Sequence, residues 1–192
     1  SPEAGRLAAH LREGYQLEVV AAEPLVRDPV AIDWGSDGRL WVAEMADYPY
    51  GMDGKGAPGG RIRYLEDRDG DGRFDHSQLF LEGVNFPTSV MPWRSGVLVA
   101  AAPEIFWAED RDGDGRADHR EVLYRGFMEG NQQLRVNSLR WGLDGWVYCA
   151  SGGHHAGFGA ENQIQGMRAG QSFPLGSHDF RFAPDSGRLE SL

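Results

Sequence analysis

A single cysteine, Cys149, stands among the 192 residues, so the sequence offers neither an internal disulfide framework nor a zinc site built from several cysteines. No apolar run approaches the ~18 residues that a membrane-spanning helix requires. The Gly-x-Ser-x-Gly, P-loop and dinucleotide-binding motifs are also missing, which argues against hydrolase, nucleotidase and nicotinamide-dependent functions. Cys149 itself lies in the apolar run 146–150, so we expect a buried structural thiol and not a nucleophile.

Basic residues are scarce as well. There are 19 Lys and Arg residues against 29 Asp and Glu residues, which gives a net charge of −10. A nucleic-acid partner is therefore not expected, because the phosphate backbone requires a basic face. Glycine, by contrast, is abundant: the 27 glycines are about twice the usual share. This content is too high for a helical bundle and favours short strands joined by tight turns.

The beginning of the chain has helical character. Ser1 is a suitable N-cap, Pro2 suits the first helical position and Gly14 is a suitable stop, so residues 1–14 are expected to contain a short helix. Apolar and polar residues then alternate over residues 15–20, which predicts a strand.

From residue 29 onward the chain repeats one pattern. A strand, a tight turn and a second strand occur over residues 29–44, 86–102 and 136–150. The first two copies continue into a third strand, an acidic loop and a fourth strand, and the two acidic loops begin at Asp67 and Asp110. A four-stranded unit repeating every ~40–50 residues is typical of a β-propeller blade, whereas a β-sandwich does not predict an internal copy.

We therefore predict an all-β fold, a partial β-propeller with a short N-terminal helix. The helix occupies residues 1–14 and the incomplete propeller domain residues 15–192. The domain would hold about three four-stranded blades, roughly residues 29–82, 86–126 and 134–192. Closed propellers have ~4–8 blades, so the chain would be the front part of a longer protein and an open arc. Such an arc is expected to leave apolar surface bare on its two terminal blade faces.

The acidic loops 67–75 and 110–118 carry the strongest local signal, because Ca²⁺ requires oxygen ligands at loop positions 1, 3, 5, 9 and 12, a carbonyl at 7 and glycine at 6. The second loop has Glu121 at the twelfth position, whereas the first has Gln78, so tighter binding is expected at the second. A metal-free Asp/Gly hairpin turn is the alternative. The expected calcium is structural and lies at hairpin tips. The predicted ligands are Asp67, Asp69, Asp71, Arg73, Asp75, Asp110, Asp112, Asp114, Arg116, Asp118 and Glu121.

A second group of candidates lies in loops expected on one face. His154 and His155 belong to a glycine-rich stretch that follows a second strand. They are candidates for an acid–base or ligand role, and the alternative is that they are solvated loop histidines. The aromatic, glycine-rich loop 45–60 and the polar residues Asn131–Gln133, Arg135 and Asn137 are expected to reach the same face. Convergent polar loops are the default hypothesis for a binding site. The strand tryptophans are expected to pack the blades, with carbohydrate stacking as the alternative.

Several of these motifs together resemble a known family. They are residues 20–29 (VAAEPLVRDP), residues 39–49 (RLWVAEMADYP), the twin DxDGDGxxD loops and residues 131–142 (NQQLRVNSLRWG). As a set, they are similar to the propeller of the planctomycete and verrucomicrobial membrane-bound dehydrogenases, itself similar to the six-bladed glucose/sorbosone dehydrogenases. The resemblance implies pyrroloquinoline quinone (PQQ) and Ca²⁺ as cofactors and a sugar, alcohol or other small-molecule substrate. It also implies a downstream haem (cytochrome) domain and an extracytoplasmic location, periplasmic or at the cell surface. Arg135 and Asn137 are its candidates for cofactor binding.

The sequence departs from that family at the expected catalytic positions. Leu134 stands where the family has its histidine base, and Gly153 stands near its orienting aspartate; neither can do that chemistry. His154 and His155 are the candidate substitutes. Two functions therefore stay open. One is the calcium-binding module of a PQQ-dependent sugar or alcohol dehydrogenase, inactive as this chain alone. The other is a non-catalytic, calcium-stabilised propeller that binds glycan or protein through its loop face.

Overall fold

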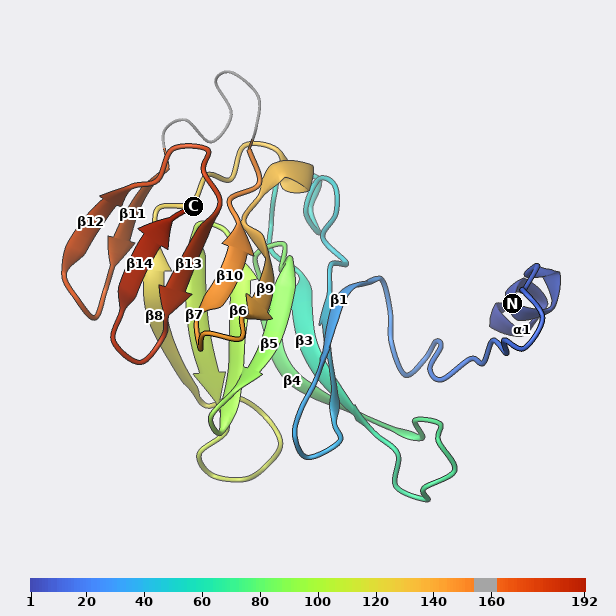
Figure 1. The fold of residues 1–192 in the computed structure, drawn as a ribbon. Helices are drawn as coiled ribbons and strands as arrows, with labels where there is room; N and C mark the ends of the chain where they lie inside the picture. The colour runs from blue at the N-terminus through green and yellow to red at the C-terminus, as the bar shows by residue number, and fades with distance from the viewer. Residues whose placement is uncertain (154–161) are drawn as a thin grey trace.

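The chain is built mainly of β-strands, as the computed structural model shows for residues 1–153 and 162–192 (Figure 1). The elements of the first half are α1 (Pro2–Ala8), β1 (Pro29–Trp34), β2 (Leu40–Glu44), β3 (Gly60–Glu66), β4 (His76–Val84), β5 (Ser89–Trp93), β6 (Gly96–Ala101) and β7 (Glu104–Glu109). Those of the second half are β8 (His119–Arg125), the 3-10 turn η1 (Gln132–Leu134), β9 (Asn137–Trp141), β10 (Val147–Ala150), β11 (Gln163–Gly166), β12 (Gln171–Pro174), β13 (Phe180–Ala183) and β14 (Arg188–Ser191). The predicted all-β class with one short N-terminal helix is confirmed.

The N-terminal helix α1 is shorter than its predicted region and stands away from the sheets (Figure 1). Ser1 caps it by accepting the N–H of Ala4 at 3.3 Å, and Pro2 occupies its first turn. The strand predicted over residues 15–20 is wrong, because these residues form no ladder. The carbonyl of Val20 accepts the N–H of Phe74, which lies in the loop between β3 and β4. Alternation alone does not make a strand when no neighbouring strand is present. Within residues 1–153 and 162–192, no helix has the length and hydrophobicity of a membrane span.

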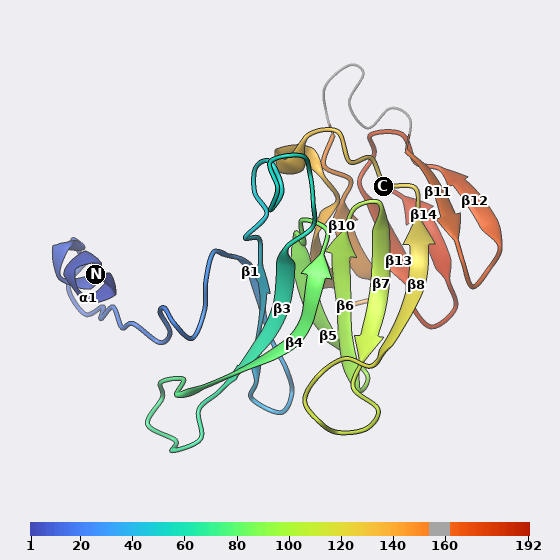
Figure 2. The same ribbon diagram turned by 180° about the vertical axis from the view of Figure 1, so that it is seen from behind.

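The strands form three antiparallel sheets. Sheet A has the order β1-β2-β3-β4, and sheet C has the order β14-β13-β10-β9. Sheet B continues from β5-β6-β7-β8 into β11 and β12, because β11 pairs with β8 (Figure 2). The third repeat, which the sequence pattern presented as partial, therefore contains a complete four-stranded sheet, and its β11–β12 hairpin is an insertion that extends the preceding sheet.

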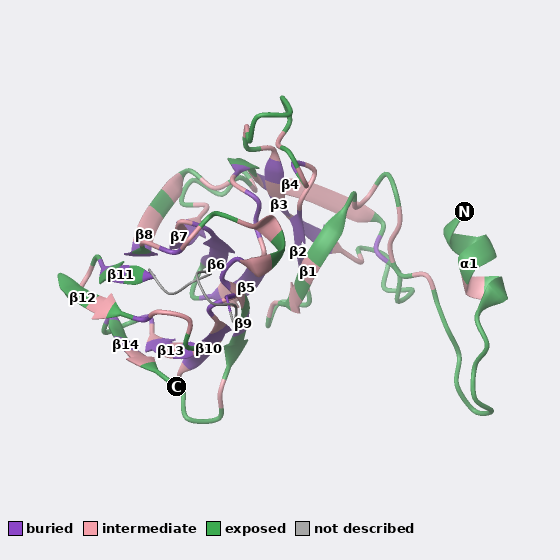
Figure 3. Cartoon of the chain, turned by 90° about the horizontal axis from the view of Figure 1, so that it is seen from above, coloured by how far each residue is buried: buried purple, intermediate pink, exposed green. Residues whose placement is uncertain are grey.

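The first strands of the three sheets are neighbours: β1 contacts β5, and β5 contacts β9 (Figure 3). Aromatic side chains fill the space between the sheets. Trp41 and Phe80 meet edge to face, with ring centroids 4.8 Å apart, in the cluster between sheets A and B. Tyr124 packs on Phe182 between sheets B and C, in the cluster that also holds Cys149. Cys149 is 4% exposed and its burial raises the pKa of the thiol, so the predicted buried structural thiol is confirmed.

The bare apolar faces that an open arc predicts are found only in part: on the outer face of sheet A, Ile32 and Trp34 of β1 stay 48% and 60% exposed, opposite the buried Val42 and Leu40. Residues 20–28 cover the remainder of this face, where Leu25 and Val26 pack against a cluster that includes Leu65 and Phe74. The outer face of sheet C is polar, because cross-strand neighbours there are charged or aromatic. Its members are Arg140, Asp144, Trp146, Tyr148, Arg181, Arg188 and Glu190. These side chains pair with one another, so the face is compatible with solvent.

Candidate functional site

The two acidic loops form the tips of equivalent hairpins. The first joins β3 to β4 and the second joins β7 to β8, and both lie at the end of the sheets opposite η1 (Figure 1). Their predicted position between the third and fourth strands of a unit is confirmed. Each loop forms a hairpin tip because strand-forming residues flank it on both sides, and the glycines inside it permit the sharp turn of the backbone.

In the first loop, a network of backbone donors holds the carboxylates. Asp67 accepts the N–H of Gly70 at 2.7 Å on one oxygen and the N–H of Gly72 at 2.9 Å on the other. Both glycines have positive φ, +77° and +90°, which a residue with a side chain rarely adopts. Asp69 accepts the N–H of Asp71. Carboxylate oxygens of Asp67, Asp69 and Asp71 consequently lie within 4.8 Å of one another.

The second loop repeats this network. Asp110 accepts the N–H groups of Gly113 at 2.7 Å and Gly115 at 2.8 Å, and Asp112 accepts the N–H of Asp114. Burial raises the pKa of Asp110, but the N–H groups of Gly115 and Gly113 outweigh it and hold this pKa below its usual value. Carboxylate oxygens of Asp110, Asp112 and Asp114 also lie within 4.8 Å of one another.

The remaining predicted ligands close each loop. Asp75 accepts the N–H of Arg68 and Asp118 that of Arg111, which fastens the end of each loop to its start. At the seventh position, predicted to offer a backbone carbonyl, Arg73 and Arg116 donate their N–H groups at 2.8 Å to the aspartate two residues before. Five backbone hydrogen bonds are thus the same in both loops.

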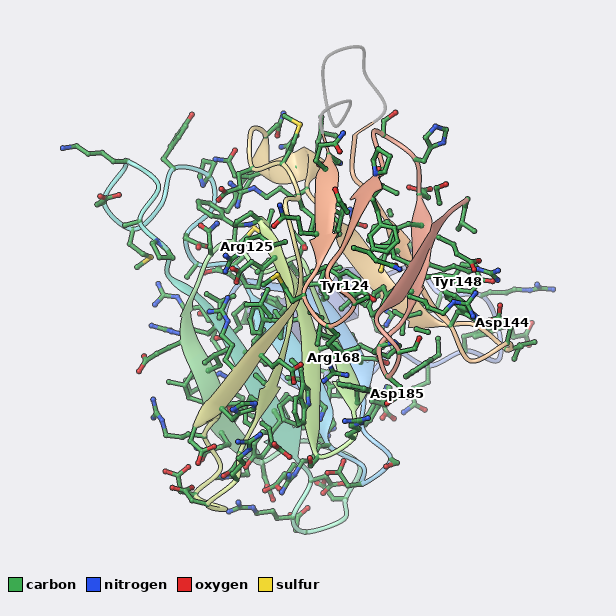
Figure 4. The ribbon with its side chains drawn as sticks, turned by 90° about the vertical axis from the view of Figure 1, so that its left-hand side faces the viewer. Tyr124, Arg125, Asp144, Tyr148, Arg168 and Asp185 are labelled. Atoms are coloured by element: carbon green, nitrogen blue, oxygen red, sulfur yellow. The ribbon has the colours of Figure 1, made fainter. Side chains whose placement is uncertain are left out.

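Glu121, the expected twelfth ligand, is not brought to its loop. It lies in β8 and forms a two-point ion pair, at 2.7 and 2.9 Å, with Arg168 of the β11–β12 turn. Arg168 is labelled in Figure 4. Arg168 also donates to the carbonyl of Pro184, so it joins sheets B and C. The same guanidinium holds the pKa of Glu121 below its usual value. The structure therefore gives the two loops equivalent donor sets and removes the basis for expecting tighter binding at the second.

Replacing Glu121 by glutamine is expected to lower the free energy of unfolding by about 1 kcal/mol, the upper range for a partly exposed ion pair. Because the pair joins two sheets and is not part of the loop, the loss should be the same with calcium and with chelator. Urea unfolding measures it. The matched control is Glu82→Gln, since Glu82 pairs with Arg116 in an exposed position and should change nothing measurable. A loss confined to calcium-containing buffer would instead make Glu121 a ligand.

A pocket lies at the opposite end of the sheets, among their first strands. Its volume is about 650 Å³, and residues of β1, β5, η1 and β9 line it. The predicted cofactor candidates Arg135 and Asn137 both belong to this lining. Arg135 is 5% exposed, and its Nε and NH2 groups donate to the carbonyl of Glu129 at 3.1 and 2.8 Å. Asn137 donates to the carbonyl of Arg135 at 2.8 Å.

Two of the segments predicted to share this face, the loop 45–60 and residues 131–137, do converge. Gln133 of η1 donates to the hydroxyl of Tyr48, in the loop between β2 and β3, at 2.6 Å. An adjoining pocket of about 500 Å³ is lined by residues of both loops, among them Met45 and Gln132. Of the catalytic candidates, Leu134 is half-buried in η1 and Gly153 is buried. His154 and His155 lie outside the described residues.

Sequence reasoning missed two lining residues of β5 and its approach, Thr88 and Ser89. Their signal was present in the repeat. Counting back four positions from the tryptophan that ends each first strand gives Val30, Ser89 and Asn137, and all three line the pocket. Asn137 was identified, and its equivalent Ser89 was not.

Among curated proteins, none matches this sequence. The three sheets, the paired loops and the pocket span the chain from β1 to β14, and the helix α1 precedes them. A family model described as a domain of unknown function (DUF7133) matches residues 1–192, and the chain therefore belongs to that family.

Proposed function

We propose that this chain is a calcium-stabilised β-propeller module that binds a ligand through its loop face. Three antiparallel sheets support the assignment of the sheets as blades: two have four strands, the third has four strands extended by the β11–β12 hairpin, and their first strands contact one another in series. The loop between β2 and β3 and the turn η1 lie at one end of the sheets, and the acidic loops lie at the other.

The duplicated acidic loop is the observation that carries the calcium proposal. Each loop gathers three carboxylates within 4.8 Å, where they repel one another unless a cation is present. Ca²⁺ takes six to eight oxygen ligands, and a fourth aspartate and backbone carbonyls are available in each loop. One aspartate cluster on a surface is common, but two clusters with the same five hydrogen bonds from backbone N–H groups indicate that both loops have the same function, cation binding. The ion would supply cohesion at the hairpin tips and no chemistry at the pocket.

Quinone-dependent oxidation receives less support from the described residues. Such a reaction needs a base at the substrate, and the 650 Å³ pocket is lined by no His, Asp or Glu within residues 1–153 and 162–192. Leu134, at the position of the family base, is a hydrocarbon and cannot accept a proton. We therefore derive no oxidation step and favour the binding function over the dehydrogenase function implied by resemblance.

A calcium titration followed by calorimetry tests the proposal. We expect saturable binding of two Ca²⁺ per chain, one at each loop, with Mg²⁺ a poor competitor because it demands a small octahedral site and gives up its waters reluctantly. Asp69→Asn and Asp112→Asn variants should each reduce the stoichiometry by one. Weak, non-saturating heats with the wild-type chain would show that the loops are metal-free hairpin turns.

A further inference from the structure

The charge of the large pocket is opposite to that of the chain. Although acidic residues exceed basic ones by 29 to 19, the charged residues that line the 650 Å³ pocket are two arginines, Arg135 and Arg140. Arg140 is partly compensated, since its NH1 lies 3.2 Å from a carboxylate oxygen of Asp33. Arg135 forms no ion pair with any carboxylate in the described parts of the chain.

The guanidinium of Arg135 is buried, yet it has no ion-pair partner among the described residues. Its guanidinium lies over the Phe86 ring, 4.6 Å from the centroid, and is 5% exposed. Its buried NH1 group has no hydrogen-bond acceptor among the described residues. Burial lowers the pKa of this guanidinium, whereas the more distant charges of Glu129 and Asp47 raise it. Buried charges in proteins are normally paired and hydrogen-bonded, so this arginine is the feature that a ligand would complete.

The other residues that line the pocket are uncharged, and they are of two kinds, polar and apolar. Amides and hydroxyls come from η1, β5 and β9, namely Gln132, Gln133, Thr88, Ser89, Asn137 and Ser138. Apolar groups come from β1 and its neighbour, for example Val30, Ile32 and Met45. A wall of this kind suits a small molecule with several hydroxyl groups and a carbon skeleton. The volume of about 650 Å³ is within the usual range for small-molecule sites.

We propose that this pocket binds a hydroxylated monocarboxylate, a sugar acid or hydroxy acid, with the carboxylate directed at Arg135. One guanidinium without an ion-pair partner among the described residues matches one carboxylate, and the planar guanidinium suits a planar carboxylate. A doubly charged phosphate ester is disfavoured, because the net charge of −10 repels it more strongly. The inference rests on the proposed loop-face binding function but does not depend on calcium or on the acidic loops. An experiment can therefore contradict the calcium proposal without contradicting the carboxylate proposal, and the reverse.

The test is calorimetric titration of the full chain with D-glucuronate, its neutral analogue D-glucuronamide, D-glucose and inorganic phosphate. We expect D-glucuronate to bind at least about tenfold more tightly than D-glucuronamide, since a hydrogen bond to a charged group contributes more than a neutral one. Equal binding of the acid and the amide would overturn the role of the charge. No binding of D-glucuronate, or tighter binding of phosphate, would overturn the ligand class.

Two matched variants at one position test the location without removing Arg135, whose loss risks misfolding. Ser138 lines the pocket, is exposed and has φ +61°, a conformation that Asn and Asp tolerate. Ser138→Asp should weaken D-glucuronate about tenfold or more through repulsion of like charges, and Ser138→Asn, which enlarges the side chain without adding a charge, should weaken it by a clearly smaller factor. If both variants bind D-glucuronate like the wild type, the carboxylate does not lie in this pocket.

Discussion

Replacing Glu44 by alanine is expected to lower the free energy of unfolding by about 3 kcal/mol, the lower end of the range for breaking a buried ion pair. Glu44 is 1% exposed, and its Oε1 accepts Arg63 Nε at 3.2 Å and the backbone N–H of Arg27 at 2.8 Å. Arg63 then bonds Ser77, whose hydroxyl donates to the carbonyl of Leu25. The carboxylate thus fastens the N-terminal segment over sheet A. Its Oε2 has no partner, which is why the lower end of the range applies.

Urea unfolding measures this loss, and two variants control it. Glu44→Gln keeps an acceptor for the N–H of Arg27 but removes the charge, so its loss should be smaller than that of Glu44→Ala. Glu82→Ala removes an exposed partner of Arg116 and should cost almost nothing. Hydrogen exchange should show residues 20–28 exchanging faster in Glu44→Ala, with β6 and β7 unchanged. Equal stability of Glu44→Ala and the wild type would mean that this segment is held by its apolar contacts alone.

The hairpins of this fold could be predicted from sequence because their information is local. Each strand, turn and strand lies within about twenty residues, and the alternation and the Asp/Gly turns appear in the repeat itself. The acidic loops were located for the same reason. Their ten backbone hydrogen bonds join residues at most seven positions apart.

Features that depend on distant partners could not be predicted in this way. The β11–β12 hairpin pairs with β8 of the preceding sheet, where Gly126 has φ +111° and a Cβ would lie 2.2 Å from the carbonyl oxygen of Gln163. Glu121 has the spacing of a calcium ligand, yet Arg168, 47 residues later, determines where its carboxylate lies. The burial of Arg135 likewise comes from contact with Phe86. Spacing specifies which residues are available, but tertiary packing decides which way they face.

The two proposed sites lie at opposite ends of the same sheets, so the groups proposed to stabilise the fold are distant from the groups proposed to bind the ligand. A cation at the acidic tips would hold β3 to β4 and β7 to β8, whereas the pocket is built from the first strands and the loops beside them. Both depend on the packing between sheets A and B, where the rings of Trp41 and Phe80 lie 4.8 Å apart. Calcium should therefore raise global stability without altering the charge preference of the pocket.

The double variant Asp69→Asn, Asp112→Asn is expected to remove the calcium-dependent stability of the chain. A cation at 100 times its dissociation constant adds about 2.7 kcal/mol for each site that forms only in the folded state, so two loops add about 5 kcal/mol. Asparagine keeps the oxygen that accepts the N–H of Asp71 in the first loop and of Asp114 in the second, so stability in chelator should be unchanged. Each single variant should lose half of the calcium effect, because the two loops share one geometry.

Urea unfolding in calcium and in chelator measures all four chains: the wild type, the two single variants and the double variant. Asp67→Asn is the contrasting control, because Asp67 accepts N–H groups on both oxygens and an amide nitrogen cannot accept the second. This variant should therefore lose stability in chelator as well. A double variant that still responds to calcium would place the ion elsewhere. Unequal single losses would mean that the loops are not equivalent, and a larger loss at Asp112 would restore Glu121 as a ligand of the second loop.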